Sequence, residues 1–140
     1  MQFYSTNRKT SPVSLREAVV RGLATDRGLF MPEVIRRFPP AFYQNMKEMT
    51  LREISFVVAE AFFGENVEAG KLKEIVDETL NFDIPLVQVA DNRYSLELFH
   101  GPTLAFKDVG ARFMARLLAY FNKQEGERQV NVLVAKSGDT

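Results

Sequence analysis

The sequence contains no cysteine, and His100 is its only histidine. The lack of cysteine excludes disulfides, thiolate nucleophiles and thiolate metal sites. A single histidine also excludes a histidine-rich metal centre, and we expect no metal site. Chemistry must therefore come from Lys, Asp, Glu, Ser, Thr or Tyr side chains, or from a bound cofactor.

Long apolar runs and an excess of one charge are also lacking. No run approaches the roughly 20 residues that a membrane-spanning helix needs, and residues 1–5 (MQFYS) do not resemble a secretory signal. Eighteen basic residues balance eighteen acidic ones, which gives no reason to expect a nucleic-acid or membrane partner. The simplest compartment is the cytoplasm.

What is present is a globular composition, with 46% hydrophobic and 26% charged residues in 140. Ser14 with Glu17, and Thr50 with Glu53, have the spacing of helix-capping boxes. The second predicts a helix that ends at Gly64. Further helices are predicted after 39–40 (PP) and from Asn66. The last of these would bury four side chains, namely Leu72, Ile75, Val76 and Leu80.

The apolar period changes after Pro85. Residues 86–89 and 94–99 read as two strands joined by a turn at 91–92, and a long apolar helix follows a break at 101–102. Its buried side would hold seven residues, namely Phe106, Val109, Phe113, Met114, Leu117, Leu118 and Phe121. Residues 130–135 (VNVLVA) read as a strand buried on both faces of a parallel sheet. We therefore predict an α/β protein with a mainly helical domain at 1–84 and the beginning of an α/β domain at 85–140.

A buried strand needs neighbouring strands and covering helices. The sequence ends five residues after the predicted strand at 130–135, so we expect these 140 residues to be part of a larger protein. An unpaired apolar strand also tends to associate with another copy. The alternative to an enzyme fragment is therefore a non-catalytic, self-associating unit, which would be dimeric or poorly soluble.

Lys107 is the most notable candidate for chemistry. It stands at the predicted opening of the long helix, where the partial positive charge of the helix disfavours a second cation. Burial would favour the neutral amine further, and a neutral lysine amine is a nucleophile that can form a Schiff base with an aldehyde. A solvated surface lysine is the simpler interpretation from spacing alone.

Other polar residues allow a functional and a structural interpretation. Residues 135–140 (AKSGDT) form a glycine-containing loop after the predicted strand, which suits a carboxylate or phosphate but is also an ordinary polar turn. His100 could act as an acid or base, or hold the turn. Asp108 most simply complements the helix dipole. Arg112 and Arg116 could meet an anion or form a solvated face.

Three segments resemble the threonine synthase family. Residues 98–108 (LFHGPTLAFKD) closely resemble its cofactor-lysine motif, 22–32 (GLATDRGLFMP) its N-terminal signature, and 137–140 (SGDT) the start of its substrate-binding loop. They occur in the family's order, and together they span nearly the whole chain.

The resemblance implies a fold type II pyridoxal-phosphate enzyme, a lyase of threonine biosynthesis, whose α/β sandwich is incomplete in this chain. Such an enzyme converts O-phospho-L-homoserine and water to L-threonine and phosphate. Lys107 would be the catalytic residue and would hold pyridoxal 5'-phosphate as a Schiff base. The substrate would be bound by four loop residues, namely Ser137, Gly138, Asp139 and Thr140.

The chain departs from the family's pattern at Lys136, where threonine is usual. It also stops before the glycine-rich loop that binds the cofactor phosphate, so we expect the 140 residues alone to be inactive. A related phospho-lyase or a threonine dehydratase would share Lys107 and the loop. The N-terminal signature disfavours the dehydratase, whereas the phospho-lyase stays open.

Overall fold

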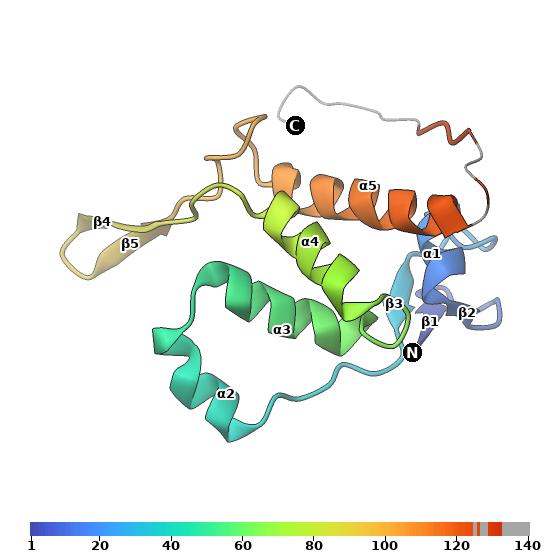
Figure 1. Cartoon of the computed structure of the whole chain (residues 1–140), viewed down its shortest axis with the longest axis horizontal. Coiled ribbons are helices and arrows are strands. Elements are labelled where there is room, and N and C mark those ends of the chain that lie inside the picture. Colours follow the sequence, from blue (N-terminus) through green and yellow to red (C-terminus); the bar gives the residue numbers. More distant parts are fainter. Residues whose placement is uncertain (125, 127–128, 133–140) are drawn as a thin grey trace. The chain divides into compact units, whose positions relative to one another are not determined.

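The computed structural model describes residues 1–124, 126 and 129–132. The chain divides into two compact units, Met1–Asp77 and Glu78–Thr140 (Figure 1). This division lies within helix α4 (Ala69–Thr79), ahead of the change in composition near residue 84. The functional domains at 1–84 and 85–140 stay a prediction.

A three-stranded antiparallel sheet opens the first unit, in a region predicted to be mainly helical. Its strands are β1 (Gln2–Ser5), β2 (Val13–Ser14) and β3 (Phe30–Pro32), in the order β2-β1-β3. Phe3 lies opposite Val13 on one side and Pro32 on the other. Strand β1 alternates as a half-buried strand should, because Phe3 and Ser5 are buried whereas Gln2 is exposed.

Helix α1 (Leu15–Arg21) follows β2 directly and contacts both β1 and β2. The Ser14 hydroxyl accepts a hydrogen bond from the Glu17 amide at 3.2 Å, which is the N-cap half of the predicted capping box. The Glu17 carboxylate pairs with Arg21 at 2.8 Å. Leu15, Ala18 and Val19 are buried, which leaves the charged pair on the outer face.

The next three helices agree well with prediction. Helix α2 (Pro40–Asn45) begins at the second proline and leads into the short 3₁₀ helix η1 (Met46–Glu48). Helix α3 (Leu51–Phe63) has the complete Thr50–Glu53 capping box and ends at Gly64. Helix α4 begins three residues later than predicted. All four residues of its predicted stripe are buried, namely Leu72, Ile75, Val76 and Leu80.

The second unit contains the hairpin of β4 (Leu86–Ala90) and β5 (Arg93–Leu96), and helix α5 (Lys107–Gln124) (Figure 1). Strand β5 is shorter than the predicted 94–99. All of β4 is exposed, on both faces. Leu117 and Phe121 of α5 are buried, whereas Met114 and the preceding Phe106 are exposed. Within the described residues, the predicted side of α5 is thus fully buried only toward its C-terminal end, whereas Val109 and Phe113 are half-buried.

Arg112 of α5 ties this helix to the end of α4. Its guanidinium donates to the Glu78 carbonyl at 2.7 Å and to the Asn81 side chain at 2.9 Å. The last carbonyls of a helix lack intrahelical partners and carry partial negative charge, so a cation stabilises them. Arg116 pairs with the Glu78 carboxylate at 2.7 Å. Both arginines therefore make structural contacts, and the anion contact considered from sequence stays a prediction.

The strand predicted at 130–135 is not found in its described part, residues 130–132. They lie outside any strand, and Val130 and Val132 are exposed. The physical reason is that the neighbouring strands that a parallel strand needs are not among the described residues. Residues 133–135 lie outside the described part. Within that part, no helix is long and apolar enough to cross a membrane.

Candidate functional site

Lys107 is the first residue of α5, as predicted, and its side chain is exposed. The expected contribution of burial to its reactivity is therefore not found in this chain. The predicted position at the N-terminus of the helix is confirmed. Across residues 1–124, 126 and 129–132, Lys107 has no hydrogen-bond or ion-pair partner.

The loop before Lys107 folds back on the first turn of α5. The Leu104 amide donates to the Gly101 carbonyl at 3.0 Å, and Leu104 has a positive φ of 58°. Asp108 is only 4% exposed, and its carboxylate accepts the Thr103 amide at 2.8 Å. From sequence, Asp108 was predicted only to complement the helix dipole. The hydrogen bond to the Thr103 amide was not predicted, because the residue pattern gives no signal for a contact with a loop amide.

His100 has a local partner. Its Nε2 lies 2.6 Å from the Glu97 carboxylate, and its ring stacks on Phe99 with centroids 4.9 Å apart. These contacts favour the role of holding the turn before Gly101. The other predicted site residues, Ser137, Gly138, Asp139 and Thr140, lie outside the described residues, as does Lys136.

A hydrogen-bonded network centred on Asp26 joins the segment 22–32 to the end of β1. The Asp26 carboxylate accepts the Ser5 hydroxyl at 2.6 Å and the amides of Lys9 and Gly28 at 3.0 Å each. The Ser5 hydroxyl oxygen accepts the Asn7 amide at 3.2 Å. An aspartate that accepts the amide two residues further on forms a turn, and the Asp26 and Gly28 pair is such a signal within the sequence.

The Asp26 network predicts an acid-sensitive contribution to stability. The Ser5 hydroxyl bond, with smaller contributions from the Gly28 and Lys9 amides, lowers the pKa of Asp26. A carboxyl group with a lowered folded-state pKa stabilises the protein above its unfolded pKa of about 4, and this stabilisation is lost as pH falls through the folded value. The melting temperature of wild type should therefore exceed that of Asp26→Asn most at pH 6–7 (about neutral).

The same comparison at lower pH provides the control. Below about pH 4 the difference between the two proteins should shrink, since Asp26 of wild type becomes neutral, as the asparagine of the variant already is. The carboxyl groups of Glu53 and Glu65 also have lowered pKa values, from hydrogen bonds to Thr50 and to the N-terminal amino group respectively. They titrate in both proteins and cancel in the difference. A difference that is constant across this pH range would contradict the prediction.

Gly28 has no room for a side chain. A Cβ atom here would overlap the Ser5 hydroxyl oxygen and lie 2.9 Å from the Asn7 amide nitrogen. Gly28→Ala should lower the free energy of unfolding by about 1–3 kcal/mol in urea denaturation, the usual cost of overpacking. Gly70→Ala is the matched control, because its Cβ would meet only the flexible Glu68 side chain, at 2.9 Å. Equal stability of the two variants would count against a crowded Gly28.

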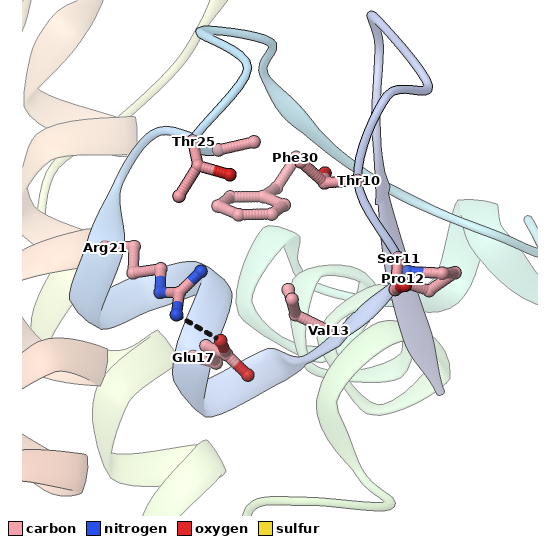
Figure 2. Close-up of a pocket in the computed structure, with 9 residues that line it drawn as sticks. Thr10, Ser11, Pro12, Val13, Glu17, Arg21, Thr25 and Phe30 are labelled. Atoms are coloured by element: carbon pink, nitrogen blue, oxygen red, sulfur yellow. Dashed lines mark ion pairs between the residues drawn. The ribbon is translucent and has the colours of Figure 1, made fainter.

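A pocket of about 290 Å³ lies in the first unit, between α1 and the sheet region (Figure 2). Thr10, Ser11, Thr25 and Phe30 are among the residues that line it. Arg21 faces it while paired with Glu17. None of the predicted site residues lines this pocket. Its cation is already neutralised by a partner, so we assign it no ligand.

Comparison with known proteins agrees with the segments identified above. The family described as "Threonine synthase N terminus" matches residues 2–80. The threonine synthase of Serratia marcescens is 39% identical over the whole chain, and that of Escherichia coli is 36% identical. The chain covers 32% of each of these two relatives. It thus spans about a third of their length.

Solved structures extend the likeness to three dimensions. The PLP-bound threonine synthase from Brucella melitensis is 34% identical and superposes with a TM-score of 0.85, over 91% of this chain and 29% of that chain. The Escherichia coli threonine synthase gives a TM-score of 0.81 over 86% of this chain and 28% of that one. The mixed helices and strands are therefore part of the α/β fold of those enzymes, and the chain belongs to the threonine synthase family, whose N-terminal region it matches.

Proposed function

We propose that the full-length protein, meaning this chain continued to the length of its relatives, is a threonine synthase. It converts O-phospho-L-homoserine and water to L-threonine and phosphate. The observation that carries the proposal is the placement of Lys107, an exposed amine without a partner among the described residues, on the first turn of α5. The full-chain identity of 39% to a threonine synthase supports the same activity.

Lys107 fits the attachment of pyridoxal 5'-phosphate. Lys107 is exposed and begins α5, and a primary lysine amine can form a Schiff base with an aldehyde. When bound, the cofactor supplies an electron sink for carbanion chemistry. The Lys107 amine would accept and return protons at the carbon atoms next to the substrate nitrogen. The relative from Brucella melitensis is described as PLP-bound, which supports this cofactor.

The proposal also covers the substrate-binding loop, the domain division, the compartment and the activity of the 140 residues alone. We assign binding of the substrate carboxylate to Ser137, Gly138, Asp139 and Thr140. We also retain the domains at 1–84 and 85–140, and the cytoplasm as compartment. The 140 residues alone should be inactive, because Lys107 is the one residue among them that we assign to the cofactor, and they span about a third of the length of the relatives.

Self-association of the isolated chain is part of the proposal as well. Its support comes from β4 and β5, where Leu86, Val89, Tyr94 and Leu96 are each more than half exposed. A two-stranded hairpin is marginally stable without a covering surface, and exposed strand edges pair with other chains. Light scattering should show a mass that rises with concentration. A monomer over a wide concentration range would contradict self-association.

The experiment that tests the function has two readouts on the full-length protein. Incubation with pyridoxal phosphate, reduction with borohydride and mass mapping should place the adduct on Lys107. Lys123, exposed at the other end of α5, is the internal control. Product analysis with O-phospho-L-homoserine should give threonine and phosphate. An oxo acid would indicate a phospho-lyase instead, and labelling scattered over many lysines would reject the assignment of Lys107.

A further inference from the structure

Asp108 is buried in the structure, although a carboxylate is costly to remove from water unless hydrogen bonds compensate it. One compensating bond comes from the Thr103 amide at 2.8 Å. A second favourable term is the helix N-terminus, since Asp108 lies in the first turn of α5. The carboxylate therefore joins the loop that precedes α5 to the beginning of the helix.

Gly101 shows how close this contact is. A Cβ atom on Gly101 would lie 2.5 Å from Asp108 Oδ2 and 2.8 Å from Asp108 Cβ, which is too near for any side chain. Gly101 itself is buried. The Leu104 amide closes the turn by donating to the Gly101 carbonyl at 3.0 Å. Asp108 thus contacts the loop at two points, the Thr103 amide and the Gly101 backbone.

Consecutive residues of a helix point in directions about 100° apart. Asp108 accordingly faces inward and Lys107 faces solvent. The two side chains form no ion pair among the described residues. Any influence of Asp108 on Lys107 must therefore pass through the backbone of the loop and the first helical turn.

We propose that Asp108 is a positioning residue for Lys107: by holding the 101–106 loop against the first turn of α5, it fixes where the Lys107 amine is presented. This inference rests on the proposed function of Lys107. It gives Asp108 and Gly101 a shared role that follows from their contact. Asp108 donates no proton and touches no reacting atom in this role.

The test uses the full-length protein and three variants, Asp108→Ala, Asp108→Asn and Gly101→Ala. The first readout is hydrogen exchange of the Thr103 amide without added cofactor. Loss of a hydrogen bond to a charged acceptor should speed this exchange about tenfold or more in Asp108→Ala. Asp108→Asn retains a carbonyl acceptor and should stay within about threefold of wild type. Gly101→Ala leaves the carboxylate intact but forces it away, so it should resemble Asp108→Ala.

The second readout is the selectivity of borohydride trapping, expressed as the ratio of adduct on Lys107 to adduct on Lys123. This ratio should fall at least about threefold in Asp108→Ala and Gly101→Ala, and recover in Asp108→Asn. A general loss of stability would not change the preference between two exposed lysines on one helix in protein that circular dichroism shows to be folded.

Each outcome decides between the two proposals. If wild type shows no preference for Lys107, the proposed function is wrong, and the positioning role with it. If wild type prefers Lys107 and both Asp108→Ala and Gly101→Ala retain that preference, only the positioning role is wrong. Should Asp108→Ala not fold, Gly101→Ala decides alone, and a wild-type ratio in that variant overturns the inference.

Discussion

Replacement of Lys107 by alanine should lower threonine formation by the full-length protein by at least about three orders of magnitude, because residues that bond covalently contribute on this scale or more. The same variant should give no borohydride adduct at position 107. The measurement is the initial rate of phosphate release at saturating O-phospho-L-homoserine and pyridoxal phosphate. Far-ultraviolet circular dichroism should be unchanged, since the Lys107 side chain is exposed.

Two further variants separate a covalent role from a purely electrostatic one. Lys107→Arg retains the positive charge but not the primary amine, and should be as inactive as Lys107→Ala. Lys123→Ala removes another exposed lysine of α5 and should keep the wild-type rate within about twofold. Activity of Lys107→Arg above about a tenth of wild type would show that charge suffices, and the proposed role of Lys107 would be lost.

Replacement of Leu72 by alanine should lower the free energy of unfolding of the first unit by about 2–5 kcal/mol. The Leu72 side chain has 0% of its surface exposed and is the first residue of the buried α4 stripe, which continues with Ile75 and Val76. The loss combines the transfer of the side chain from water with the cavity that alanine leaves. Urea denaturation followed by circular dichroism measures it.

Leu23→Ala is the matched control for Leu72→Ala. It removes the same atoms from a side chain that is 54% exposed and lies outside the helices. Its effect should be about 0.5 kcal/mol or less. A loss below about 1 kcal/mol for Leu72→Ala would mean that the site collapses around the smaller side chain, and that α4 is less rigidly packed than its burial indicates.

Sequence reasoning predicted the elements whose signals are local. The Thr50–Glu53 capping box and the α4 stripe each depend on residues within a few helical turns of one another, and both are present. Strands β1, β2 and β3 have two to four residues each and pair across as many as 29 positions, as between Phe3 and Pro32. Such short strands form only because they pair with strands that are distant in the sequence. They are too short to show a periodic apolar pattern from which they could be predicted.

The candidate site divides in the same way. The start of α5 at Lys107 follows from the break at Gly101 and the apolar helix behind it. The burial of Asp108 depends on how the loop folds back and brings the Thr103 amide to its carboxylate. The neighbouring residues in the sequence do not predict this loop conformation. The strand predicted at 130–135 depends on partners from elsewhere in a sheet. A local run of apolar residues therefore could not determine whether this strand forms.

The bonds from Arg112 to Glu78 and Asn81 change how the intervening chain contributes to folding entropy. These bonds join the two ends of the chain segment that contains β4 and β5. The ends are therefore held together independently of the length of the segment between them. For a flexible loop, each doubling of length costs only about 0.6 kcal/mol of closure free energy. Extra residues inserted at the Asp91–Asn92 turn should therefore disturb the junction of α4 and α5 little. The hairpin tip is the place where this fold can vary in length at small thermodynamic cost.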